Sequence, residues 1–151
     1  RSLSTNPEYL RNDASDSGEV IDYRDWQIPL GRRFRALKLW LVLKLYGVKQ
    51  LRAMIERHCQ LADQFAEWVD GQPQLELFGC QLNLVTLVHV GGNQESESLL
   101  RKVNQNRRVF LTQAKVGDQF ILRVCIGQRA TSRKHLDILL SEFAAALGGS
   151  S

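Results

Sequence analysis

The sequence predicts an α+β domain with a small, mainly antiparallel sheet that helices cover on one face, preceded by an extended arm and a buried helix. Apolar residues recur at helical spacing through residues 32–71, and strand-like alternation then appears in short segments of residues 72–151. The 151 residues, 44% of them hydrophobic, suffice to enclose one core. No apolar run reaches the roughly 18 residues that cross a bilayer, which argues against a membrane-spanning chain.

Residues 1–31 are predicted to form an extended arm that leads into the domain. They contain Pro7 and Pro29, a run of small polar residues at 12–18, and no helical stripe. The chain begins at Arg1 with neither an initiator methionine nor a signal peptide, so we expect a cut end and a longer protein.

Residues 32–71 are predicted to form two helical segments that link the arm to the domain. Gly47 interrupts the pattern, and the second segment ends near Gly71 and Pro73. The first segment is apolar on nearly every side, which predicts burial on several sides; its apolar residues are Phe34, Leu37, Leu39, Trp40, Leu41, Val42, Leu43 and Leu45. The second is amphipathic, with a stripe of Leu51, Met54, Ile55, His58, Leu61, Ala62, Phe65 and Val69.

Residues 72–151 are predicted to form the α+β domain itself. We expect, in order, strands at 75–78 and 82–90, a helix at 96–107, strands at 109–114 and 119–126, and a last helix between a cap at 131–132 and the glycines at 148–149. Alternation predicts that four residues of the last strand face the core, namely Phe120, Leu122, Val124 and Ile126. Arg123 then points to the opposite face of the sheet.

The cysteines and histidines favour neither a disulfide framework nor a zinc site. Cys59, Cys80 and Cys125 are odd in number and widely spaced and lack a C-x-x-C pair, which is typical of reduced thiols in a cytoplasmic protein. His58 and Cys59 are adjacent, but neighbouring helix residues point about 100° apart and no third ligand follows at a useful spacing. We therefore expect His58 to be a packed, hydrogen-bonded residue.

Charge alternates in blocks along the chain. Residues 1–30 hold 3 basic and 6 acidic groups, residues 31–60 hold 8 and 1, residues 61–100 hold 0 and 6, and residues 101–151 hold 9 and 3. A nucleic-acid-binding domain more often gathers its positive charge on one face with aromatic residues interleaved. The pattern therefore favours solvated faces and docking surfaces over nucleic-acid binding.

Three motifs in the first half carry a resemblance to a known family. Residues 7–10 read Pro-Glu-Tyr-Leu, residues 16–18 read Asp-Ser-Gly, and residues 22–38 read Asp-Tyr-Arg-Asp-Trp-Gln-Ile-Pro-Leu-Gly-Arg-Arg-Phe-Arg-Ala-Leu-Lys. The chain resembles the pyridoxal-phosphate-dependent group II amino-acid decarboxylases, in particular those that act on aromatic L-amino acids. The resemblance continues through residues 45–48 and, more weakly, 120–123. It implies the C-terminal small domain of a fold-type I enzyme.

The resemblance implies a catalytic role for Tyr9. In the family, this tyrosine lies on a flexible loop that closes over the active site of the neighbouring subunit and protonates Cα of the substrate after CO2 leaves. A phenol on a closing loop can deliver that proton while the loop excludes water. Family members with phenylalanine here tend toward aldehyde-forming chemistry, so Tyr9 favours plain decarboxylation.

The resemblance also implies substrate-binding residues. Leu30 and Gly31 match a segment that lines the substrate side-chain pocket, where glycine accompanies catechol or indole substrates and serine accompanies histidine. The lack of a Cβ at Gly31 lets a larger ring approach the backbone, although Gly31 also suits a hinge between arm and helix. Arg123 matches a strand position that often presents an arginine to the substrate α-carboxylate; a domain-interface or solvent role stays open for it.

The implied cofactor is pyridoxal 5′-phosphate, bound in the complete enzyme by a lysine upstream of the arm. No lysine of this chain follows a histidine as that lysine does. The implied partners are the N-terminal large domain of the same enzyme and a second subunit, in a homodimer whose active site is shared. The expected substrates are DOPA, 5-hydroxytryptophan, tyrosine or tryptophan, converted to amines and CO2. The alternative is a non-catalytic α+β binding or dimerisation module, which the missing lysine keeps open.

Overall fold

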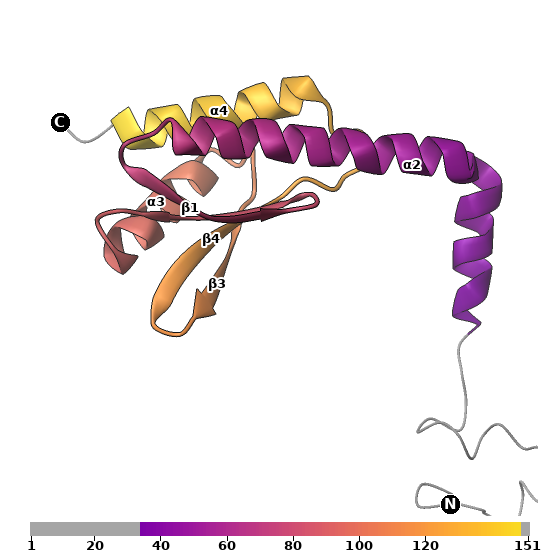
Figure 1. Cartoon of the computed structure of the whole chain (residues 1–151), viewed down its shortest axis with the longest axis horizontal. Helices are drawn as coiled ribbons and strands as arrows, with labels where there is room; N and C mark the ends of the chain where they lie inside the picture. The colour runs from indigo at the N-terminus through magenta and orange to yellow at the C-terminus, as the bar shows by residue number, and fades with distance from the viewer. Residues whose placement is uncertain (1–33, 149–151) are drawn as a thin grey trace, which may run out of the picture. The chain divides into compact units, whose positions relative to one another are not determined.

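The structure, a computed structural model, describes residues 34–148 (Figure 1). The elements in order are α2 (Arg35–Asp70), β1 (Leu75–Gln81), β2 (Leu84–His89), α3 (Asn93–Gln105), β3 (Thr112–Val116), β4 (Gln119–Cys125) and α4 (Arg133–Gly148). The order of helices and strands predicted for these residues is confirmed. None of the described helices is long and apolar enough to cross a membrane.

The two strand boundaries that differ most from the prediction, the end of β1 and the start of β3, do so for reasons that lie in the backbone hydrogen bonds. β1 continues beyond the predicted end at 78, because a bulge between Leu77 and Gly79 shifts the register and breaks the alternation of the sequence. β3 begins after Leu111, whose backbone N–H and C=O both bond to the side chain of Asn104, at 2.8 and 3.0 Å, in place of a neighbouring strand.

The chain divides into two compact units between Leu45 and Tyr46. Close to this division, α2 is broken at Gly47, whose φ of 72° and ψ of 152° are not helical. A Cβ at this position would meet nothing within 4 Å, so glycine is needed for the backbone conformation and not for space. The interruption predicted from the sequence is confirmed.

The sheet is antiparallel throughout, with strand order β1-β2-β4-β3. β1 with β2 and β3 with β4 are hairpins, and β2 pairs with β4 at the centre, which places Val85 opposite Val124 and Leu87 opposite Leu122. The small antiparallel sheet expected from the alternating segments is confirmed.

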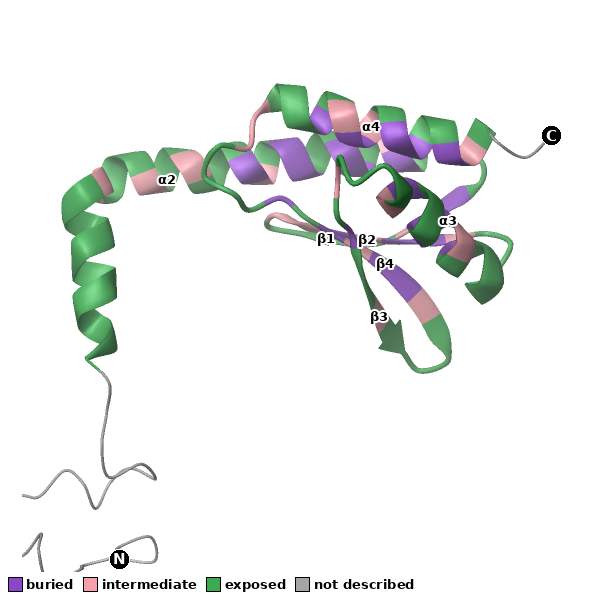
Figure 2. Cartoon of the chain, turned by 180° about the vertical axis from the view of Figure 1, so that it is seen from behind, coloured by how far each residue is buried: buried purple, intermediate pink, exposed green. Residues whose placement is uncertain are grey.

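The core lies between one face of this sheet and helices α2, α3 and α4. Figure 2 shows buried residues concentrated in the second part of α2, in α4 and in the strands. At its centre, the ring of Phe65 lies 5.9 Å from that of Trp68 and 5.3 Å from that of Phe143. The buried core residues are Leu61, Ala62, Phe65, Ala66, Val69, Leu75, Val85, Leu87, Leu99, Leu100, Val103, Leu111, Leu122, Val124, Ile126, Leu136, Leu139, Phe143 and Ala146.

The buried polar side chains Glu142 and His58 differ in whether their atoms have hydrogen-bond partners. Glu142 of α4 is buried, and its two carboxylate oxygens accept hydrogen bonds from Asn106 (2.9 Å) and Arg108 (2.8 Å), which ties α4 to the α3–β3 connection. His58 is buried as predicted, with 3% of its surface exposed, but its Nε2 has no hydrogen-bond partner among the described residues. The packed histidine is confirmed, but the hydrogen bond expected for it is not found at Nε2.

Candidate functional site

Arg123 is the one predicted site residue that the described part of the chain contains. It lies in β4, opposite Thr86 of β2 on one side and Thr112 of β3 on the other. Its neighbours Leu122 and Val124 are core residues, so alternation places Arg123 on the opposite face, as predicted. Its side chain is half-buried and forms no ion pair with any described residue.

The sheet face that carries Arg123 lies away from the helices. Ile121 is only 1% exposed yet lies outside the core cluster, so this face has some apolar packing of its own. The Thr86 hydroxyl donates to the carbonyl oxygen of Gly79 at 3.0 Å, which orients the residue beside Arg123. A guanidinium set between two threonines, without a carboxylate partner, has the donors that bind a carboxylate in a bidentate manner.

Tyr9, Leu30 and Gly31 lie outside the described residues, so their roles stay predictions. The described structure therefore places Arg123 but brings no second predicted site residue beside it. The described residues begin at 34, after the arm at 1–31 that carries the other three.

The first part of α2, residues 35–45, exposes apolar side chains around its whole circumference. Exposed fractions run from 39% at Leu43 to 74% at Leu45, and the ammonium of Lys44 lies 5.7 Å from the centre of the Trp40 ring. The sequence predicted burial of this segment on several sides, and the described residues do not provide it. The buried residues of α2 begin only at His58. An exposed apolar surface of this extent is typical of a site that binds protein.

A contact that the sequence did not reveal lies beside the break in α2. Arg129, in the connection from β4 to α4, donates from Nη1 to the Tyr46 hydroxyl oxygen at 3.2 Å. Its guanidinium carbon lies 5.5 Å from the centre of the Tyr46 ring. This cation–π contact joins the residue before Gly47 to the connection that follows β4, the strand that holds Arg123. The interruption at Gly47 was the only sequence signal near it.

The described residues do not by themselves fit pyridoxal phosphate. A lysine that bonds to the cofactor has to be shielded from water, whereas every described lysine is exposed: Lys38, Lys44, Lys49, Lys102, Lys115 and Lys134. Within residues 34–148, no three His, Cys, Asp or Glu side chains are grouped so as to hold a metal ion.

Among the free thiols, Cys80 is held in its less reactive, neutral form. Cys59, Cys80 and Cys125 are free. Burial, followed by the negative charge of Asp63, raises the pKa of Cys80, whose Sγ lies 3.7 Å from Asp63 Oδ1. Both effects favour the neutral thiol over the reactive thiolate.

Comparison with known proteins identifies a family whose model matches the chain. The model of the pyridoxal-dependent decarboxylase conserved domain matches residues 1–89. The chain is 41% identical over 145 residues to the aromatic-L-amino-acid decarboxylase of Drosophila lebanonensis, covering 95% of this chain and 36% of the relative. It is 41% identical over 142 residues to the phenylacetaldehyde synthase of Arabidopsis thaliana, covering 89% of this chain and 29% of the relative.

A solved structure shows the same fold. The crystal structure of Oryza sativa TDC with PLP and tryptamine superposes with a TM-score of 0.78 at 32% sequence identity, covering 97% of this chain and 32% of that chain. The chain therefore spans about a third of the length of the relatives that it matches. The α+β domain described above corresponds to one part of a larger, PLP-containing molecule.

Proposed function

Because the chain belongs to the pyridoxal-dependent decarboxylase family, we propose that it is the C-terminal part of an enzyme that converts aromatic L-amino acids to amines and CO2. The match over residues 1–89 carries this proposal, and relatives named for decarboxylation of aromatic amino acids support the substrate class. The proposed substrates are DOPA, 5-hydroxytryptophan, tyrosine or tryptophan. The proposed location is the cytoplasm, which the free thiols support.

Tyr9 is the proposed proton donor. After CO2 leaves, Cα of the substrate needs one proton on one face, and a phenol carried by a closing loop can hold that proton close while water is excluded. Since the relatives include both a decarboxylase and an aldehyde synthase, the residue at this position decides the product in our proposal. Tyr9 favours the amine.

Leu30, Gly31 and Arg123 are the proposed substrate-binding residues. Gly31 leaves space for the aromatic ring beside the backbone. Arg123, with no carboxylate partner among the described residues, is available for the substrate α-carboxylate or for a carboxylate across a domain interface. Replacing Gly31 by serine is expected to lower kcat/KM for DOPA relative to histidine, and unchanged relative values would overturn the pocket assignment.

The proposed partners are the large domain of the same enzyme, which would supply the lysine for pyridoxal phosphate, and a second subunit that shares the active site. The apolar surface of α2 at 35–45 supports such partners, because nothing in the described unit covers it.

The experiment that tests the function uses the full-length protein with pyridoxal phosphate. We expect CO2 and the corresponding amine from an aromatic L-amino acid. A folded, cofactor-loaded protein that releases no CO2 from any of the four substrates would favour the alternative, a non-catalytic binding or dimerisation module.

A further inference from the structure

A surface hollow along the second half of α3 carries positive charge that the proposed reaction does not use. Ser98, Arg101, Lys102, Gln105 and Arg107 are among the residues that line it. The lining contains three cationic side chains and no carboxylate. The hollow is therefore a basic site on the surface of the α+β domain.

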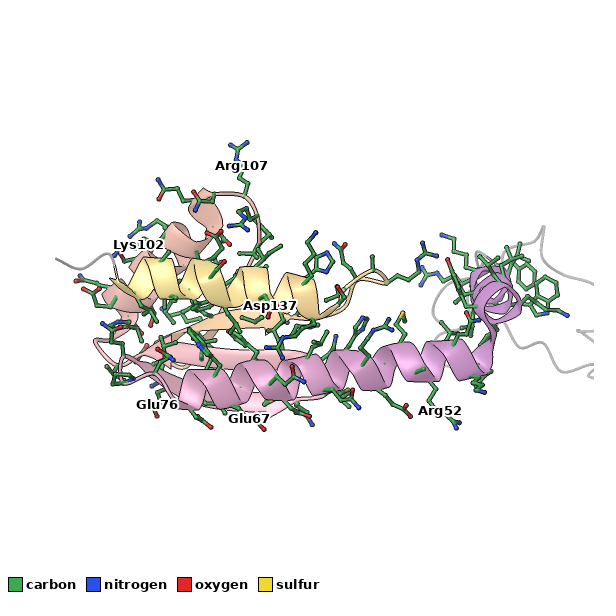
Figure 3. The ribbon with its side chains drawn as sticks, turned by 90° about the horizontal axis from the view of Figure 1, so that it is seen from above. Arg52, Glu67, Glu76, Lys102, Arg107 and Asp137 are labelled. Atoms are coloured by element: carbon green, nitrogen blue, oxygen red, sulfur yellow. The ribbon has the colours of Figure 1, made fainter. Side chains whose placement is uncertain are left out.

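The positive charge of this hollow is little neutralised by the rest of the described structure. Arg101 Nη1 lies 3.7 Å from Glu97 Oε1, but both side chains are more than half exposed, so solvent screens the pair. Lys102 and Arg107 form no ion pair with a described residue. They lie on the α3 side of the domain, whereas Glu67 and Glu76 lie on the opposite side (Figure 3).

Arg107 occupies a backbone conformation that suits glycine better. It follows Asn106, the C-cap of α3, and has a φ of 55°. Its N–H donates to the Asn104 carbonyl oxygen at 3.1 Å, which closes the end of the helix. The hydrogen bond at the helix end uses backbone atoms alone, so it does not need the side chain. Arg107 therefore places an exposed guanidinium beside the hollow at a backbone position that is strained for a non-glycine residue.

An exposed aromatic residue follows the strained arginine. Phe110, three residues after Arg107, is 83% exposed, more than any other large apolar residue in the described part of the chain. Arginine and exposed aromatic residues are the types enriched where proteins bind one another. The positive charge of Arg107 and the exposed ring of Phe110 thus lie on one short stretch of chain.

We propose that Arg101, Lys102, Arg107 and Phe110, the α3 basic surface, bind an acidic peptide segment of a partner protein that carries an apolar residue. Residues 98–105 of α3 rise about 10 Å along the helix axis, which matches about three residues of an extended peptide. Two or three carboxylates can then meet the cations while the apolar residue contacts Phe110.

The surface suits a peptide better than a nucleic acid. One exposed aromatic residue does not provide the successive stacking platforms that bind single strands.

The test is fluorescence anisotropy of a labelled Glu-Glu-Leu-Glu-Glu peptide with the full-length protein, beside the same peptide with lysine for glutamate and an oligouridylate of matched charge. We expect saturable binding of the acidic peptide alone, weakened about tenfold by Arg107→Gly. Because glycine relieves the backbone, Arg107→Gly is expected to keep or raise Tm. Lys102→Glu and Phe110→Ser should also weaken binding, whereas Lys115→Glu, which changes another exposed lysine on β3, should not.

Two results would overturn the proposal. These are equal binding by the wild type and Arg107→Gly, and tighter binding of the oligouridylate than of the acidic peptide.

Discussion

The two parts of α2 behave differently although both are rich in apolar residues. Residues 48–70 concentrate their apolar side chains on one stripe, and from His58 onward that stripe is buried in the core. Residues 35–45 carry apolar side chains on every side and remain exposed in the described structure. One domain face can cover one stripe of a helix, so a helix that is apolar all round needs further protein around it.

The largest effect on the free energy of unfolding is expected from a substitution in the buried part of α2. Phe65→Ala removes the ring that packs against Trp68 and Phe143, and should lower the free energy of unfolding by about 3–5 kcal/mol. Hydrogen exchange of the β4 amides in the full-length protein measures this loss. The matched control, Phe78→Ala at a half-exposed ring, should cost less than about 1 kcal/mol. Equal effects of the two substitutions would contradict the core assignment.

A smaller effect is expected in the exposed part of α2, and only if other parts of the protein cover it. Leu41→Asp would then place a carboxylate in an apolar interface, at a cost of about 2–3 kcal/mol. Limited proteolysis of the full-length protein should show faster cleavage near residues 35–45. Lys38→Asp on the same segment is the control. No change in cleavage with Leu41→Asp would mean that this segment faces solvent in the complete protein.

The smallest effect on stability is expected from a substitution at Gly47, where the two parts of α2 meet. Gly47→Ala introduces a side chain where φ is 72° and ψ is 152°, a region that glycine alone adopts readily, at a cost of about 1–3 kcal/mol. Because no atom lies within 4 Å of the added Cβ, the loss would come from the backbone alone. Thermal unfolding measures it. Gly148→Ala, also without a nearby atom, is the control; a Tm for Gly47→Ala as high as for this control would show that the break is not strained.

The sequence predicted the fold well because apolar periodicity and glycine positions reflect local physics. The alternation of Leu122 and Val124 and the interruption at Gly47 both correspond to what the structure shows. The end of β1 and the start of β3 were misplaced, since the bulge after Leu77 and the hydrogen bonds of the Asn104 side chain with Leu111 depend on backbone pairing that apolar alternation does not record.

The candidate site was less predictable than the fold. Alternation placed Arg123 on the correct face of the sheet, but its flanking threonines depend on the pairing of three strands. The contact of Arg129 with Tyr46 spans 83 residues and leaves no local signature. Tyr9, Leu30 and Gly31 were assigned through motif resemblance, and all three lie outside the described residues.

The central claim is tested most directly by the products of Tyr9→Phe in the full-length protein with an aromatic L-amino acid and pyridoxal phosphate. We predict that the wild type yields the amine with equimolar CO2. Tyr9→Phe, which lacks the proton donor to Cα, should lose most amine formation and, with dissolved O2 as the two-electron oxidant and water, give aldehyde, ammonia and H2O2 beside the CO2. Tyr23→Phe serves as the control for loss of a phenol elsewhere in the arm. An unchanged amine yield with Tyr9→Phe would show that Tyr9 is not the proton donor.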